Sequence, residues 1–95
     1  MTRAAEHVYT DQRDIARLEG WMKQLDDEAM VEIRLQDGRC VRGVVIARPT
    51  VQMFFDAQGR EGMNGVVRID DVADPELSHF LWLDQITAVE RIGTD

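Results

Sequence analysis

The sequence predicts a mainly β fold, in which an N-terminal α-helix is followed by a strongly bent five- to six-stranded antiparallel barrel. Three observations support this prediction. Apolar residues recur every three or four positions from residue 15 to 25, and then at every second position from 31 to 35. Several short strand-like runs follow, separated by turns that contain glycine or proline. Finally, a chain of 95 residues can bury one core, so we expect residues 1–95 to form a single domain.

The helix is expected over residues 10–28. Thr10 is suited to be the N-cap, and the carboxylates of Asp11 and Asp14 follow in the first turn, where they favour the positive end of the helix dipole. The apolar positions form one stripe that would face the barrel, made of Ile15, Leu18, Trp21, Met22 and Leu25. Residues 1–9 show no periodicity, which predicts a flexible arm.

Residues 30–93 are expected to form the barrel, beginning with a hairpin around the Asp37-Gly38 turn signal. A loop of residues 37–39 would place core residues opposite core residues, and burial favours that register. The expected pairs on the buried face are Leu35 with Val41, Ile33 with Gly43, and Val31 with Val45.

The remaining barrel strands are shorter. Glycines recur in the segment 58–65, which predicts a mobile loop, and residues 70–78 predict an acidic loop. Residues 84–86 have the character of one tight turn between two strands. The strands themselves are expected at 50–56, 66–69, 79–83 and 87–92.

The stretch 31–45 resembles the first Sm motif, with Leu35, Gly38 and Gly43 at its leucine and glycine positions. The tail 81–92 resembles the strand–turn–strand ending of Sm-like and SH3-like barrels. This Sm-like resemblance covers roughly residues 10–92. The whole chain is also similar to a family of small uncharacterised proteobacterial proteins that carry a variant of the Sm-like fold. The resemblance implies a helix-led Sm-like barrel.

The Sm-type RNA pocket is not carried over with the fold. Pro49 stands where RNA-binding Sm proteins usually have an aspartate, and no asparagine follows it. The arginine-glycine pair of the second motif is absent between Phe80 and Thr87. Sm rings join the fourth strand of one subunit to the fifth of the next, and the irregular insertion 57–78 lies beside those edges. We therefore favour a dimer over a ring.

The charge distribution leaves a second hypothesis open. The net charge of −7 disfavours a nucleic-acid partner, yet residues 29–48 carry a balance of +2. In the expected register Arg34 and Arg42 lie opposite each other, with Glu32 or another acid on the same face. Together with Phe54 as a stacking platform, the possible anion- or nucleic-acid-binding residues are Arg34, Arg39, Arg42 and Arg48.

No set of catalytic or metal-binding residues can be assembled from the sequence. Cys40 is the only cysteine, which excludes an intrachain disulfide and a multi-thiolate metal site. His79 has no evident partner and is expected to be structural or exposed. Carboxylates at 70, 71, 74 and 76 could bind a hard cation, but they lack the spacing of a calcium loop and favour a solvated acidic segment. We expect no cofactor and no enzymatic activity.

These observations favour a non-catalytic interaction or self-association module that forms homodimers. The alternative is weak binding of RNA or single-stranded nucleic acid through the basic first hairpin, within residues 29–48. No apolar run approaches the ~18 residues that span a membrane, and the N-terminus lacks the features of a secretory signal. We therefore expect a cytoplasmic protein with no membrane partner.

Overall fold

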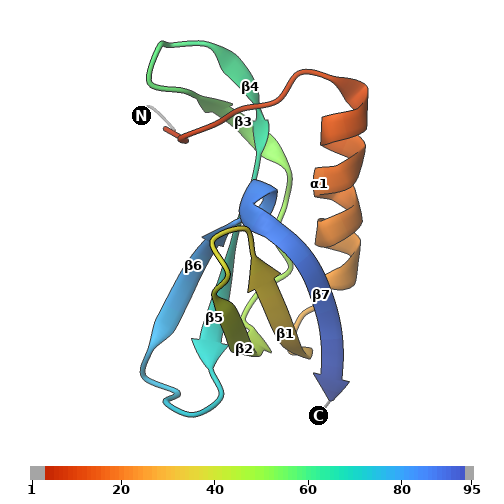
Figure 1. Ribbon diagram of the computed structural model, residues 1–95, viewed down its shortest axis with the longest axis vertical. Helices are drawn as coiled ribbons and strands as arrows, with labels where there is room; N and C mark the ends of the chain where they lie inside the picture. Colours follow the sequence, from red (N-terminus) through yellow and green to blue (C-terminus); the bar gives the residue numbers. More distant parts are fainter. Residues whose placement is uncertain (1–3, 94–95) are drawn as a thin grey trace.

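The computed structural model describes residues 4–93 (Figure 1). A five-stranded antiparallel sheet has the strand order β6-β5-β2-β1-β7, and β3 pairs with β4 in a separate two-stranded sheet. The elements are α1 (Gln12–Gln24), β1 (Met30–Leu35), β2 (Cys40–Val45), β3 (Gln52–Phe55), β4 (Glu61–Asn64), β5 (Val66–Asp71), β6 (Ser78–Trp82), the 3-10 turn η1 (Leu83–Gln85) and β7 (Ile86–Gly93).

Helix α1 is shorter than the expected span of residues 10–28. Its N-cap is Asp11 and not Thr10, because the Asp11 Oδ1 accepts the backbone N–H of Arg13 at 2.8 Å. The helix ends at Gln24, before three carboxylates, at residues 26–28, that would oppose the negative end of the helix dipole. The last of them, Glu28, has a φ of 65°, so the backbone turns there into β1.

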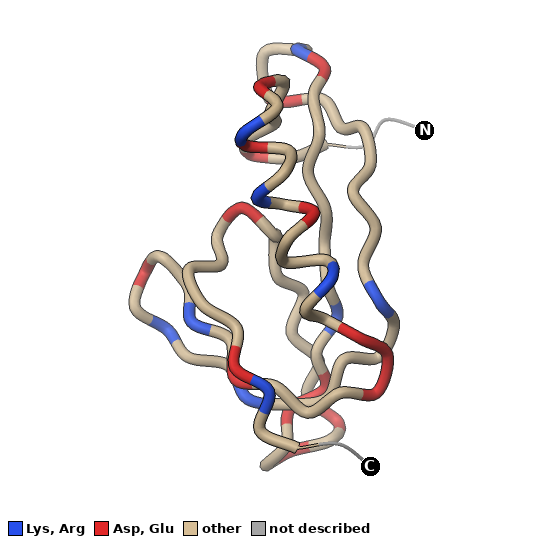
Figure 2. Tube along the Cα trace, turned by 90° about the vertical axis from the view of Figure 1, so that its right-hand side faces the viewer, with Lys and Arg blue, Asp and Glu red and all other residues tan. Residues whose placement is uncertain are grey.

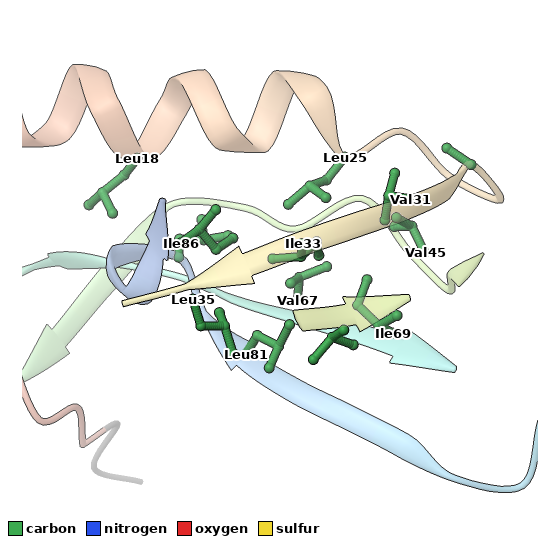
Figure 3. Close-up of a cluster of buried hydrophobic side chains, with 13 residues drawn as sticks. Leu18, Leu25, Val31, Ile33, Leu35, Val45, Val67, Ile69, Leu81 and Ile86 are labelled. Atoms are coloured by element: carbon green, nitrogen blue, oxygen red, sulfur yellow. The ribbon is translucent and has the colours of Figure 1, made fainter. Parts of the chain in front are cut away.

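The core lies between α1 and the inner face of the five-stranded sheet (Figure 3). Leu18 and Leu25 point from the helix toward this face, and both are buried. The alternation expected for the first strand is confirmed, since every second residue of β1 is buried. The sheet residues of this core are Val31, Ile33, Leu35, Val41, Val45, Val67, Ile69, Leu81 and Ile86.

The register of the first hairpin differs from the expected one by two residues. Ile33 pairs with Val41, and Val31 pairs with Gly43. The loop consists of residues 36–38, closed by hydrogen bonds from the Leu35 N–H to the Arg39 carbonyl and from the Gly38 N–H to the Leu35 carbonyl. Gly38 has a φ of 90°, which fits a type I turn followed by a left-handed residue. A shift of two preserves the buried face, so burial alone could not distinguish the two registers.

Gly43 allows β2 and β5 to approach closely. A Cβ added at Gly43 would lie 2.2 Å from the Asp70 carbonyl oxygen and 2.7 Å from the Ile69 Cγ2. Close approach of a neighbouring backbone is one of the usual reasons for a glycine within a strand. Closure of a barrel is not seen: among residues 4–93, β6 and β7 form the two edges of the sheet and do not pair with each other.

The segment expected as a mobile loop, residues 58–65, contains β4, so that prediction was wrong. Strand β4 pairs antiparallel with β3, and the paired residues run from Gln52 opposite Asn64 to Phe55 opposite Glu61. The glycine in β4 is needed for packing, since a Cβ at Gly62 would lie 2.7 Å from the Val8 Cβ.

The N-terminal segment packs across this second sheet. The expected flexible arm covers residues 1–9, of which 1–3 lie outside the described residues. Ala5 donates its N–H to the Phe55 carbonyl, and Tyr9 exchanges two backbone hydrogen bonds with Met63. The arm therefore joins the outer edges of β3 and β4, as Figure 1 shows near the top of the molecule.

Candidate functional site

The arginines of the first hairpin do not form an unpaired basic surface. Glu32 lies between two of them, with its carboxylate 3.3 Å from the Arg42 Nε and 3.9 Å from the Arg34 Nε. The observed register places Glu32 opposite Arg42 and places Arg34 opposite Cys40. The expected Arg34–Arg42 pair is therefore wrong, whereas the expected acid on that face is confirmed. Figure 2 shows acidic and basic positions interspersed along the trace.

The other two arginines also have carboxylate partners. Arg39 donates its Nε–H to Asp37 within the hairpin turn, over 2.7 Å, and bonds from Arg39 hold the Asp37 pKa below its usual value. Arg48 pairs with Asp26, and this hydrogen bond lowers the Asp26 pKa. Arg91 donates to the same carboxylate at 3.3 Å. The four candidate arginines are thus exposed, and each has a carboxylate partner, in three places along the surface.

Phe54, the expected stacking platform, is buried. Its ring meets Trp82 edge-on, with a centroid separation of 5.1 Å and an interplanar angle of 75°. A base could not stack on Phe54 without displacing this packing. The structure therefore does not bring the arginines and Phe54 together as a nucleic-acid surface.

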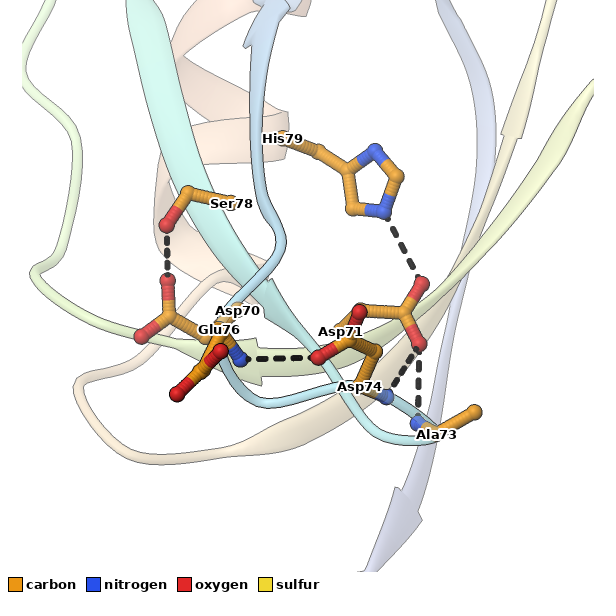
Figure 4. A network of polar contacts seen from close by, with 7 residues as sticks. All are labelled: Asp70, Asp71, Ala73, Asp74, Glu76, Ser78 and His79. Carbon is orange, nitrogen blue, oxygen red and sulfur yellow. Dashed lines mark hydrogen bonds and ion pairs between the residues drawn. The ribbon is translucent and has the colours of Figure 1, made fainter.

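The acidic loop is closed by its own hydrogen bonds (Figure 4). One Asp71 oxygen accepts the backbone N–H groups of Ala73 and Asp74, and the other contacts the His79 Nε2 at 2.9 Å. The His79 hydrogen bond is the largest cause of a lowered Asp71 pKa, followed by the two backbone N–H groups. Sequence reasoning missed this partner for His79, because Asp71 approaches it only through the β5–β6 pairing.

The carboxylates of this loop do not assemble into a metal site. Asp70 accepts the Ser78 hydroxyl at 2.8 Å and pairs with the Arg68 Nε at 3.1 Å. Within the part of the chain that the structure describes, no three His, Cys, Asp or Glu side chains are grouped to hold a metal ion.

The feature that sequence reasoning missed most clearly is the open edge at β6. Phe80, in the middle of this strand, is 66% exposed. Other large apolar side chains are exposed on the strands and turns beside it, namely Ile46, Val72 and Leu77. The sequence signal was the uncharged run Ser78–Trp82, since exposed edge strands usually carry charges that discourage pairing.

The β6 backbone is poised to pair on its free side. Next to the β5–β6 ladder, the Asp71 N–H bonds the Leu77 carbonyl, and the Leu83 N–H bonds the Gly65 carbonyl. The register between these bonds is continuous. Antiparallel alternation therefore directs the N–H and C=O groups of Ser78, Phe80 and Trp82 away from β5.

Across residues 4–93, no helix is long and apolar enough to cross a membrane.

Comparison with known proteins agrees with this architecture. The model of a family described as Domain of unknown function (DUF3247) matches residues 2–92. The crystal structure of XC5848 from Xanthomonas campestris, described as adopting a novel variant of the Sm-like motif, is similar to this chain with a TM-score of 0.92 and 44% sequence identity. The match covers 98% of this chain and 100% of XC5848. No curated protein matches. The chain therefore belongs to the DUF3247 family, whose domain here has a variant Sm-like fold.

Proposed function

We propose that this protein is a non-catalytic interaction module that self-associates as a two-fold dimer through the β6 edge. The observation that carries the proposal is the combination of an unpaired, uncharged strand with an exposed phenylalanine at its centre. Such a strand is a template for pairing with another chain. A second copy supplies a matching strand with no like-charge contact, because β6 contains no Asp, Glu, Lys or Arg.

A two-fold axis near Phe80 fits the strand direction. Two β6 strands would run antiparallel, and the outward N–H and C=O groups of Phe80 would exchange hydrogen bonds with those of the second copy. The two Phe80 rings would then lie opposite each other on the outer face, where aromatic cross-strand pairs stabilise sheets. The Arg68–Asp70 ion pair beside them is neutral as a pair, so it adds little repulsion.

The alternative functions have weaker support. Nucleic-acid binding would require the hairpin arginines, and each of them has a carboxylate partner within reach. Catalysis would require convergent groups with matched roles, and the titratable clusters in the described residues form local turns and ion pairs. A ring would require β6 of one copy to pair with β7 of the next, and β7 carries the exposed charges of Glu90 and Arg91.

Sedimentation equilibrium over a concentration series tests the proposal. We expect a monomer–dimer equilibrium for the natural chain and at least about 30-fold weaker association for Phe80→Glu, because a central buried aromatic contributes strongly to an interface. Met53→Glu is the matched control: Met53 is also an exposed apolar residue, but it lies on β3. Its dimer constant should stay unchanged.

Three results would contradict the proposal. The first is a natural chain that stays monomeric at millimolar concentration. The second is equal weakening of association by Phe80→Glu and Met53→Glu. The third is a closed assembly larger than a dimer, which would indicate head-to-tail pairing of β6 with β7.

A further inference from the structure

The acidic loop that leads into β6 carries two carboxylates without a cationic partner. Asp74 and Glu76 lie between β5 and β6, and both are exposed (Figure 4). The Asp74 carboxylate accepts the Glu76 N–H at 3.2 Å, and the Glu76 carboxylate has no hydrogen bond or ion pair among the described residues. The two bases nearest in the sequence, Arg68 and His79, each contact another carboxylate. This end of the β6 edge therefore has two unmatched negative charges.

Exposed apolar side chains lie next to these charges. Phe80 at the centre of β6 is 66% exposed, and Leu77, which directly precedes the strand, is 47% exposed. Val72 is exposed at the start of the same loop. A strand added to β6 would thus pass apolar side chains along its middle and carboxylates at one end.

A second copy of the chain does not neutralise this end of the edge. In the two-fold dimer, the start of one β6 strand lies next to the end of the other. The residues that follow β6 form η1, and Leu83–Gln85 contains no Lys or Arg. Its one charged side chain is a further carboxylate, that of Asp84. Self-association through β6 therefore brings no cation from β6 or η1 to Asp74 and Glu76.

We propose that the β6 edge also docks an extended segment of another protein, with apolar residues at its centre and Lys or Arg toward its C-terminal end. This inference rests on the open edge of the proposed function and assigns it a second occupant. Backbone hydrogen bonds give such a complex its affinity, and alternate side chains give it specificity.

The order of residues in the docked segment follows from antiparallel pairing. The residue opposite Phe80 is apolar, and the residue two positions before it passes Trp82. The residues two and four positions after it pass Ser78 and then Glu76, on the same face of the sheet. Cationic side chains at these two later positions therefore lie nearest the unmatched carboxylates. The docked segment and a second copy compete for the same backbone groups.

A short peptide with this pattern, acetyl-Thr-Val-Thr-Val-Thr-Lys-Thr-Lys-amide, serves as the probe. The control peptide has Glu in place of both Lys residues. Each is added to the nitrogen-15-labelled natural chain at a concentration below its dimer dissociation constant. We expect the lysine peptide to shift the Phe80 amide signal in a saturable way and to bind at least about tenfold more tightly than the glutamate peptide. The Met53 amide, on β3, should not respond.

Substitutions in the loop test the role of charge. Glu76→Gln should weaken binding of the lysine peptide about threefold, and the double variant Asp74→Asn with Glu76→Gln about tenfold, because exposed ion pairs contribute modestly. Glu61→Gln is the matched control, since Glu61 is an exposed glutamate without a cationic partner in the described residues but lies on β4. Added salt should reduce the preference for the lysine peptide.

The dimer proposal and this inference fail in different ways. Glu76→Gln should not weaken self-association, because β6 and η1 of a second copy offer no cation to Glu76. In sedimentation, the lysine peptide should convert dimers of the natural chain into monomers. A natural chain that is monomeric at every concentration, but whose Phe80 amide responds to the lysine peptide, would refute the dimer and support docking of a foreign strand.

The inference is refuted if the lysine peptide leaves the β6 amides unshifted at millimolar concentration, because a second copy would then be the only strand that the edge accepts. It is also refuted if the lysine and glutamate peptides bind equally. Equal weakening by Glu76→Gln and Glu61→Gln would refute it too, since that result indicates general attraction of a basic peptide to an acidic protein.

Discussion

The two edges of the five-stranded sheet differ in how they are protected. Strand β7 carries the exposed charges of Glu90 and Arg91, lies next to α1, and is tied to the helix end through the Arg91–Asp26 ion pair at 3.3 Å. Strand β6 has no charged residue and packs chiefly on β5. Charges and covering elements are the usual protection of sheet edges. One edge of this sheet thus has that protection, and the other has an exposed Phe80 in its place.

The largest expected effect comes from Gly43→Ala, which acts between the two edges. The added methyl group would meet the Asp70 carbonyl at 2.2 Å, and backbone cannot yield cheaply at the centre of a sheet. We expect the free energy of unfolding to fall by about 3 kcal/mol, as overpacking of a core does. Urea unfolding measures this change. A loss below about 1 kcal/mol would show that β2 and β5 are less tightly joined than described.

Acid should weaken the β6 side of the sheet through Asp71. The His79 hydrogen bond and two backbone N–H groups lower the Asp71 pKa in the folded state. The unfolded chain therefore binds the proton at a higher pH. This contribution is complete above the ordinary value of about 4 and is lost as pH falls through the lower folded pKa.

Asp71→Asn removes that titration. Its urea midpoint should be lower than that of the natural chain at pH 7, and the difference should shrink as the pH falls from about 4 to 2. A constant difference over this range would mean that Asp71 acts only through its shape. Asp37→Asn, in the β1–β2 turn, provides a comparison carboxylate on the other half of the sheet.

Gly20→Ala strengthens the helix beside β7 without touching β6. Nothing lies within 4 Å of a Cβ added at Gly20, so the change should gain the helix propensity of alanine, about 0.5–1 kcal/mol. Thermal unfolding measures the gain, and sedimentation should give the dimer constant of the natural chain. The same substitution at Gly43 is expected to lower the free energy of unfolding, whereas at Gly20 it is expected to raise it. Opposite signs would distinguish the packing effect at Gly43 from the backbone-entropy effect at Gly20. A loss of stability in Gly20→Ala would indicate that α1 is closer to a neighbour than described.

The smallest effect is expected for Glu90→Ala on the protected edge. Glu90 lies directly opposite Glu32, and removing one of two facing like charges should stabilise the fold by a few tenths of a kcal/mol. Association should stay within about twofold of the natural chain. A stronger dimer in Glu90→Ala would mean that β7 can also pair once its charge is removed.

The sequence predicted the elements that depend on periodicity and short turns. The α1 stripe, the buried alternation of β1, and the β6–η1–β7 ending all follow from apolar spacing. Leu35 lies in β1, Gly38 in the turn and Gly43 in β2, the places that the resemblance to the first Sm motif implied.

Features that depend on tertiary contacts could not be predicted in this way. The segment around Gly62 was predicted as a loop because the contact that requires a glycine there is made by Val8, which lies 54 positions earlier in the sequence. The two-residue register shift keeps the same residues buried, so it changed only the charges that face each other on the outside. The Tyr9–Asp84 hydrogen bond joins residues 75 positions apart, and no local pattern indicates it.

Hydrogen exchange at β6 tests the central proposal most directly. The Phe80 N–H points away from β5, whereas the alternation directs the His79 N–H toward it. If β6 pairs with a second copy, protection of the Phe80 amide should rise with protein concentration while that of His79 stays high throughout. The amides of residues 87–91 on β7 should not respond to concentration. Fast exchange of Phe80 at every concentration up to millimolar, or a concentration-dependent gain on β7 instead, would contradict the account.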